Sequence, residues 1–122
     1  MKGIGTDVVS VSRIQRSLAR SPGLVESVFT EGERAYCAAQ RTPAPHYAAR
    51  FAAKEAFLKA VGLGLFSGVA MTDIEVQHGR GRAPAMALGP TAAAALSRIG
   101  GGAPLLSLSH GGDVAQALVV VP

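Results

Sequence analysis

The chain has 122 residues, which suits one domain with one modest hydrophobic core. Hydrophobic residues make up 48% and charged residues 16%, and this composition excludes an intrinsically disordered protein. The formal net charge is +4, and much of the positive charge is scattered arginine. This pattern favours phosphorylated metabolites or acidic proteins as partners over nucleic acid. No apolar stretch reaches the roughly 18 residues of a membrane span, so we expect no membrane insertion.

Small side chains dominate the apolar part of the composition. Aromatic residues are only 5% and tryptophan is absent, so the core must rest on Ala, Val and Leu. Such a core is thin, which favours oligomer formation as a further source of burial. Cys37 is the only cysteine, so no internal disulfide can form, and the N-terminus lacks the long apolar stretch of a signal peptide. We therefore expect a cytoplasmic protein.

The first predicted elements are a strand and a short helix. Residues 2–11 are rich in β-branched side chains and predict a strand, in which Asp7 is unusual because Asp is depleted in strands. Ser12 is a candidate N-cap for a helix that runs through Ala19 and is followed by a Ser-Pro-Gly sequence at 21–23.

Two further helices are predicted in the middle of the chain. Thr30 and Glu33 have the spacing of a capping box, which predicts a helix to about residue 40. The two prolines of segment 42–45 should end that helix, and a central helix is predicted over 46–61. Gly62 is then well placed as its C-terminal cap.

The C-terminal half predicts mainly strands. In chain order we expect a strand at 73–78, a turn at 79–81, a strand at 85–88, a helix at 91–99, and strands at 105–110 and 114–121 joined by a turn at 111–113. Tight turns between successive strands favour antiparallel pairing. We therefore predict one α+β domain over residues 1–122, with helices packed on a mainly antiparallel sheet.

The central helix carries two charged stripes in an otherwise apolar sequence, RFAAKEAFLKA. At about 100° per residue, Arg50 and Lys54 form one stripe, and Glu55 and Lys59 form another roughly 140° away. A surface helix normally has one polar face. One stripe can face water, and the other needs a separate explanation.

Asp7 and Glu55 suggest a metal site if the first strand packs on the central helix. Two carboxylates brought together must share a proton or a cation. Without a His–Cys cluster nearby, a hard cation such as magnesium is the natural ligand, because it takes one or two carboxylates and completes its shell with water and phosphate. The alternative is a surface pair between Glu55 and Lys59, one helical turn apart, with Asp7 hydrogen-bonded locally. The residues alone leave both interpretations open.

Basic residues and a histidine supply candidate phosphate ligands. Arg50, Lys54 and Lys59 could together contact a phosphate, although a solvated basic face is the simpler interpretation for Lys54. His110 lies at a predicted strand end next to two serines, but no G-x-S-x-G elbow supports a Ser–His hydrolase. His46 and His78 are expected to be surface residues.

Several segments, taken in order, resemble one family. They are GIGTDVVSVSRI (3–14), FTEGE (29–33), RFAAKEAFLKAVGLG (50–64), DIEV (73–76), GRAP (81–84) and LSLSH, which ends at His110. In this order they resemble the bacterial holo-[acyl-carrier-protein] synthases, which are short 4′-phosphopantetheinyl transferases. The resemblance covers nearly the whole chain and implies that family's α+β fold. It also implies transfer of phosphopantetheine from coenzyme A to a serine of apo acyl carrier protein, which releases adenosine 3′,5′-bisphosphate.

The resemblance also implies roles for individual residues. Asp7 and Glu55 match the residues that hold magnesium on the coenzyme A pyrophosphate, and Glu55 is the candidate base for the serine proton. The matched coenzyme A contacts are Arg50, Lys54, Lys59 and, on the nucleotide side, His110. Lys59 is also expected to neutralise charge on the phosphoryl oxygens. The basic first helix, with Arg13, Arg16 and Arg20, would dock the acidic carrier protein. The family forms homotrimers with sites between subunits.

Two other classes of function compete with this interpretation. A non-catalytic coenzyme A-binding module would keep the pocket, but it would be free to lose Asp7 or Glu55, and both are present. A small nucleic-acid-binding protein would need exposed aromatic residues or a dense basic groove. Most of the few aromatic residues here sit in apolar positions.

Overall fold

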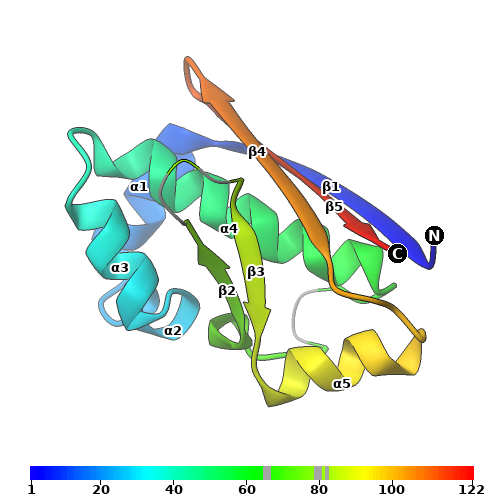
Figure 1. Ribbon diagram of the computed structural model, residues 1–122. Helices are drawn as coiled ribbons and strands as arrows, with labels where there is room; N and C mark the ends of the chain where they lie inside the picture. Colours follow the sequence, from blue (N-terminus) through cyan, green and yellow to red (C-terminus); the bar gives the residue numbers. More distant parts are fainter. Residues whose placement is uncertain (65–66, 79–80, 82) are drawn as a thin grey trace.

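The N-terminal glycines allow a strand and a helix to touch in the computed structural model. Strand β1 (Gly3–Ser10) lies against the long helix α4 (Pro43–Ala60), as Figure 1 shows. A Cβ atom on Gly3 would lie 1.9 Å from the Ala60 carbonyl oxygen, and one on Gly5 would lie 2.0 Å from that of Ala56. Any side chain here would push the helix off the strand. The early glycines therefore set the close packing that brings Asp7 to the helix.

A three-stranded antiparallel sheet holds β1 at one edge. The structure describes residues 1–64, 67–78, 81 and 83–122. Within these, β5 (Val114–Val121) lies between β1 and β4 (Leu105–Gly111), so the strand order is β1-β5-β4. Helix α4 packs on one face of this sheet, and the chain termini lie side by side (Figure 1). The predicted α+β class and antiparallel pairing of the last two strands are confirmed.

A second, two-stranded sheet packs beside α4. It pairs β2 (Ile74–Gln77) with β3 (Ala85–Leu88) in antiparallel register, as predicted. A short 3-10 turn, η1 (Met71–Asp73), precedes it, and helix α5 (Pro90–Arg98) follows. The predicted turn at 79–81 lies largely outside the described residues.

Three short helices connect β1 to α4. They are α1 (Val11–Arg20), α2 (Leu24–Val28) and α3 (Glu31–Ala38). The capping box of α3 is confirmed: the Thr30 hydroxyl accepts from the Glu33 N–H, and the Glu33 carboxylate accepts from the Thr30 N–H.

Two local predictions were wrong and one helix was missed. The N-cap of α1 is Ser10 rather than Ser12, because the Ser12 backbone and hydroxyl both donate to Asp113 from the β4–β5 turn. Helix α2 was not predicted, since its five residues are too few for a clear period. Helix α4 begins at Pro43, because proline is well suited to a helix's first turn.

The end of α4 agrees with the sequence. Gly62 has a left-handed backbone, with φ of 79°, and follows the last turn of the helix. The Leu63 N–H donates to the Leu58 carbonyl and the Gly62 N–H to the Lys59 carbonyl, which is the Schellman pattern of a glycine-capped helix. This cap fixes the position of Lys59 in the final turn.

The core is made of small side chains, as expected. Alanines of α4 at 48, 49, 52, 53 and 56 are almost fully buried, together with Phe57 and Leu58. Cys37 is also buried, and desolvation raises the pKa of its thiol to about 11, which keeps it unreactive at neutral pH. In the part of the chain that is described, none of the helices has the length and apolar character needed to span a membrane.

Candidate active site

Asp7 and Lys59 meet where β1 crosses the last turns of α4. The Lys59 ammonium donates to Asp7 Oδ1 at 3.0 Å and to the Thr6 carbonyl at 3.0 Å. The Lys59 side chain is 52% exposed and that of Asp7 15% exposed, so the pair opens to solvent. The alternative prediction, a surface pair between Glu55 and Lys59, is wrong, because the Lys59 ammonium pairs with Asp7 of β1 instead.

Glu55 lies beside this pair and is poorly satisfied. Its Oε1 atom is buried and has no hydrogen-bond partner among the described residues. Burial and then the charge of Asp7 raise the pKa of the Glu55 carboxyl, while Lys59 partly offsets this effect. Asp7 and Glu55 are therefore near enough for their charges to interact, and the Glu55 carboxylate has unused capacity for a cation or a proton.

The donor set here suits a hard cation with few protein ligands. Among the described residues, no group of three or more His, Cys, Asp or Glu side chains could hold a metal ion by itself. Two carboxylates with an orphaned oxygen match magnesium, which keeps several waters and takes substrate phosphate as further ligands. They do not match a closed zinc site, which needs four protein ligands.

Lys54 is buried and does not lie on a solvated face. Its side chain is fully inaccessible, and its ammonium donates to Glu33 Oε1 at 2.8 Å, to the Met71 carbonyl at 2.9 Å and to the Ile74 carbonyl. An ammonium has three N–H donors, and all three are used. The expected solvated face for Lys54 is therefore wrong, and its expected contact with coenzyme A has no free donor to make it.

Glu33 is the buried partner of Lys54, and its tertiary contacts were not predicted from the sequence. Besides Lys54 it accepts from the Val76 N–H at 2.9 Å and from the Thr30 N–H at 2.9 Å. One carboxylate thus joins α3, α4 and β2. The capping-box spacing gave Glu33 a local role, but its partners 21 and 43 residues away could not be inferred from local spacing.

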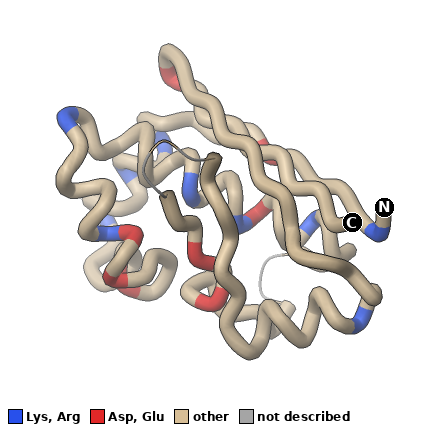
Figure 2. Tube along the Cα trace, viewed as in Figure 1, with Lys and Arg blue, Asp and Glu red and all other residues tan. Residues whose placement is uncertain are grey.

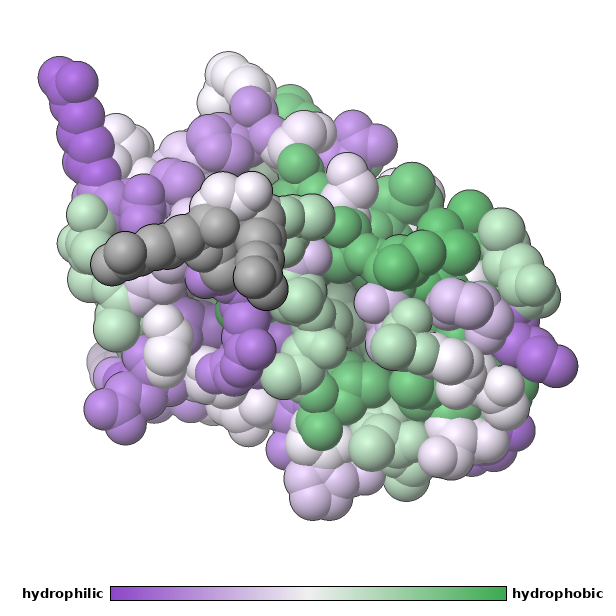
Figure 3. All heavy atoms as spheres, viewed as in Figure 1, coloured by the Kyte–Doolittle hydropathy of each residue, from purple (hydrophilic) through white to green (hydrophobic). Residues whose placement is uncertain are grey.

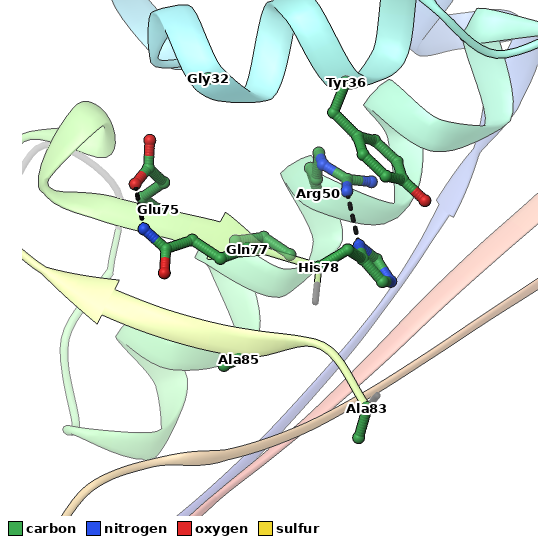
Figure 4. A pocket seen from close by; sticks show the side chains of 9 residues that line it. Gly32, Tyr36, Arg50, Glu75, Gln77, His78, Ala83 and Ala85 are labelled. Atoms are coloured by element: carbon green, nitrogen blue, oxygen red, sulfur yellow. Dashed lines mark hydrogen bonds between the residues drawn. The ribbon is translucent and has the colours of Figure 1, made fainter. Parts of the chain in front are cut away.

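Arg50 points away from Asp7, towards α3 and β2. It is 1% exposed, its guanidinium lies 4.0 Å from the centre of the Tyr36 ring, and its Nη2 donates to His78 Nδ1 at 2.8 Å. Figure 4 shows this arrangement beside a cavity of about 500 Å³ between α3 and the β2–β3 sheet. The lining of this cavity includes both the Arg50 guanidinium and the Glu75 carboxylate.

His110 joins the same region from β4. Its ring lies 5.3 Å from that of His46, and a smaller cavity of about 180 Å³ is lined by both histidines, Arg50 and His78. His78 is exposed, as expected of a surface residue, and His46 is half-buried, and the fold brings both of them close to Arg50. No local motif links these three histidines, so sequence could not have found the cluster.

Two groups of charged side chains lie on opposite sides of α4: the Asp7 set, which also contains Glu55 and Lys59, and a second set with Arg50 and His110. Arg50 and Glu55 are five residues apart, which places them about 7.5 Å apart along the axis and roughly 140° around it. The Asp7 set lies at the β1 edge, and His110 lies on β4 at the other edge of the sheet. A ligand held by both sets in one chain would have to pass around the helix.

Helix α1 presents three exposed arginines. Arg13, Arg16 and Arg20 are spaced three and four residues apart, which places them on one face. Apolar side chains of α1, α2 and α4 line a cavity of about 220 Å³ beside them, including Leu18, Leu24 and Phe51. Basic and apolar surface therefore occur together.

Charge and hydropathy divide the surface. In Figure 2 most charged residues lie on the helical half, and strands β4 and β5 carry none. In Figure 3 apolar side chains gather over these strands at the right of the view. On the sheet face away from α4, the exposed apolar residues are Ile4, Val8, Leu105, Val114 and Leu118. No described helix covers this face (Figure 1).

Comparison with known sequences matches nearly the whole chain. Residues 3–115 match the family model described as the 4′-phosphopantetheinyl transferase superfamily. A holo-[acyl-carrier-protein] synthase of Syntrophotalea carbinolica is 45% identical over 98% of this chain and 94% of its own length. One from Anaeromyxobacter dehalogenans is 49% identical over 98% of this chain and 94% of the relative.

Solved structures show the same fold. Holo-[acyl-carrier-protein] synthase from Neisseria meningitidis has a TM-score of 0.88 and 34% identity, covering 100% of this chain and 98% of that one. The Helicobacter pylori synthase in complex with coenzyme A has a TM-score of 0.84 and 28% identity, covering 98% of this chain and 99% of that one.

Proposed function

We propose that this chain, which belongs to the 4′-phosphopantetheinyl transferase superfamily, transfers the 4′-phosphopantetheine group of coenzyme A to a serine of an apo acyl carrier protein. The products are holo acyl carrier protein and adenosine 3′,5′-bisphosphate. The whole chain, residues 1–122, acts as one transferase domain. The observation that carries the assignment is the group formed by Asp7, Glu55 and Lys59 where β1 crosses α4.

Asp7 and Glu55 are the proposed magnesium ligands. The unpartnered Glu55 Oε1 and the adjacent Asp7 carboxylate support this role, because a cation would satisfy both. When bound, magnesium would neutralise charge on the coenzyme A pyrophosphate. Lys59 is held at the same place by Asp7 and the Thr6 carbonyl, with half of its side chain open to solvent.

The reaction forms a bond between the serine oxygen and the β-phosphorus and breaks the bond from that phosphorus to the bridging oxygen of the pyrophosphate. The serine proton must leave as its oxygen attacks. Glu55 is the proposed acceptor, directly or through a water. Lys59 places a positive charge beside the phosphoryl oxygens as negative charge develops on them.

Arg50 and His110 are the proposed contacts for the nucleotide end of coenzyme A. Both line the smaller cavity of about 180 Å³, on the far side of α4 from Glu55. Because the helix separates the two sets, a complete site requires a second copy that brings its smaller cavity to the Asp7 edge. We therefore propose a homotrimer with sites between subunits, and the uncovered apolar face of the β1-β5-β4 sheet supports such an assembly.

Helix α1 is the proposed docking element for the carrier protein. Its three exposed arginines suit an acidic partner, and the apolar cavity beside Phe51 can accept the partner's apolar side chains. The free, buried Cys37 supports a reducing location such as the cytoplasm.

The deciding experiment is mass spectrometry of apo acyl carrier protein incubated with this protein, coenzyme A and magnesium. We expect the carrier to gain the mass of one phosphopantetheine group, and the gain to disappear when its acceptor serine is replaced by alanine. Several apo carriers that stay unmodified in the presence of folded protein would contradict the proposed function.

The shared site has its own test. Subunits carrying Glu55→Gln and subunits carrying Arg50→Ala should each be inactive alone, and mixtures prepared by refolding together should recover part of the activity. Recovery requires that Arg50 and Glu55 of one site come from different copies. Sedimentation of the wild-type protein as a monomer would contradict the assembly.

A further inference from the structure

All three histidines of the chain converge on one arginine. The His46 and His110 rings are 5.3 Å apart between centres, and the Tyr36 ring lies 5.9 Å from His46 and stacks on His78 at 4.9 Å. The Arg50 guanidinium lies over the Tyr36 ring and donates a hydrogen bond to His78. His46 belongs to α4, His78 directly follows β2 and His110 belongs to β4, so tertiary packing alone brings them together.

Arg50 is buried without a carboxylate partner among the described residues. Its Nη1 donates weakly to the His46 carbonyl at 3.4 Å and its Nη2 to the His78 ring, while its buried Nε has no hydrogen-bond partner there. Lys54, by contrast, is neutralised by Glu33. A buried guanidinium with free donor capacity, bordered by two cavities, is a site built for an anion.

We propose that His46 and His78 join Arg50 and His110 in binding a phosphate group of the donor, and that this binding strengthens as the pH falls from about 8 to about 6.5. This inference rests on the proposed function, because it assigns two further residues and a pH response to the donor site. Neither histidine was among the residues predicted for that site.

The hydrogen bond between Arg50 and His78 gives the mechanism. A guanidinium can only donate, so His78 Nδ1 must be unprotonated while it accepts this bond. A phosphate that takes the guanidinium N–H releases His78 Nδ1, which can then bind a proton and itself donate to the phosphate. Ligand binding and proton uptake are thereby linked.

The pKa shifts agree with this linkage. Burial, followed by the charges of His110, Arg50 and His78, lowers the pKa of His46, and burial and Arg50 lower the pKa of His78. Both rings are therefore neutral in the free protein near neutral pH. A dianionic phosphate removes the repulsion from Arg50 and raises both pKa values, so each ring can gain a proton on binding.

Other charged or titratable groups also face the cluster, and among them Lys54 is paired with Glu33. The further titratable or charged neighbours are Tyr36, Cys37, Lys54 and Glu75. The pKa of Cys37 is raised to about 11 and that of Glu75 is lowered by hydrogen bonds from Thr30 and Gln77, so both move away from neutral pH. The phosphate monoester itself titrates near pH 6, below most of the chosen range.

The test is calorimetric binding of adenosine 3′,5′-bisphosphate to the intact protein. Between about pH 8 and pH 6.5, we expect the wild-type dissociation constant to fall about fivefold to tenfold, since each proton taken up contributes up to tenfold per pH unit. Titrations in two buffers with different ionisation enthalpies should show net proton uptake. His46→Gln with His78→Asn should abolish most of the pH response and the uptake.

Tyr36→Phe is the matched control, because it keeps the ring that stacks on His78 while changing a group of the same cavity. It should retain the wild-type pH response. An unchanged slope in the double histidine variant, with thermal unfolding showing that the variant is folded, would overturn the inference. If that occurs while the carrier protein is still modified, the proposed function stands and only the histidine assignment fails.

Discussion

Two lysines of helix α4, five residues apart, form ion pairs of opposite character. Lys54 is fully buried against Glu33 at 2.8 Å, and its remaining donors meet two backbone carbonyls. Lys59 is half exposed and meets Asp7 at 3.0 Å beside Glu55, whose buried oxygen has no described partner. In the Lys54–Glu33 pair every hydrogen-bond donor of the ammonium is used. Around Lys59, the Glu55 oxygen is left without a hydrogen bond from any described residue.

This difference separates structure from chemistry on one helix. A saturated buried pair gains nothing from a ligand and loses heavily when one partner is removed. An under-satisfied group at the surface costs stability until a cation, proton or phosphate arrives. The charge of a residue in the sequence does not distinguish the two cases, whereas the count of satisfied donors and acceptors does.

The largest effect should come from breaking the buried pair. Lys54→Met leaves the Glu33 carboxylate buried without its cation, and we expect a loss of about 3–5 kcal/mol in the free energy of unfolding. Lys59→Met removes an exposed partner and should cost no more than about 1 kcal/mol. Urea unfolding of both variants measures the contrast, and equal losses would contradict the structural role given to Lys54.

The next effect should be on turnover without a cost in stability. Glu55→Gln removes a proposed metal ligand and base, and we expect turnover to fall by about 10²–10⁴-fold. The raised pKa of Glu55 means that its charged form is disfavoured in the fold, so this group's contribution to stability is lost as the pH rises through that pKa. The neutral amide should therefore unfold no more easily than wild type at neutral pH.

Both readouts are needed for this variant. Turnover is followed by mass spectrometry of the carrier protein, and stability by urea unfolding without added magnesium. A variant that stays fully active would remove Glu55 from the mechanism. A variant that is inactive because it unfolds would show that Glu55 belongs to the saturated, structural class.

Lys59 should show a smaller loss of turnover. Its ammonium supports the phosphoryl oxygens but is neither a metal ligand nor the base, so we expect Lys59→Met to lower turnover by about 10–100-fold. Lys59→Arg keeps the charge and should recover part of that loss. An equal loss in both variants would indicate that the ammonium's hydrogen bonds to Thr6 and Asp7, rather than its charge, are what matters.

The Asp7–Glu55 site was predicted from the sequence, but local residue spacing alone was not sufficient to predict it. Glycines 3 and 5 and Asp7 share a strand face by simple alternation, and the ordered family resemblance placed Glu55 opposite them. Periodicity placed Lys54 and Lys59 on different stripes, but it wrongly favoured a solvated face for Lys54, because it gives the direction of a side chain and not the neighbouring element. Whether that neighbour is the Glu33 carboxylate or open solvent depends on contacts 21 residues or more away.

The histidine cluster shows the same limit. His46 lies in α4, His78 directly after β2 and His110 in β4, and they share no motif, so no periodicity could bring them together. The overlooked helix α2 and the N-cap of α1 are smaller examples, since the Asp113 that binds Ser12 comes from the opposite end of the chain. Patterns within one element were predictable, and pairings between elements required the fold.

Asp113 allows the effect of satisfied hydrogen bonds on stability to be tested separately from the effect of burial. It is exposed, yet it accepts hydrogen bonds from the Ser10 hydroxyl and from the backbone and hydroxyl of Ser12, which anchors the start of α1. These bonds lower the pKa of the carboxyl, so its contribution to stability is present above the ordinary aspartate pKa and is lost as the pH falls.

Asp113→Asn should therefore have the smallest effect. We expect a modest decrease in stability at neutral pH, smaller than that of Lys54→Met, and a weaker loss of stability on acidification than in wild type. Because Arg13 follows the anchored turn, the KM for carrier protein should rise about twofold to threefold while kcat is unchanged. Asp113→Glu, which keeps the charge, should restore part of the acid response. A decrease in kcat would instead place this turn in the catalytic region, because a defect limited to docking changes only how tightly the carrier is held.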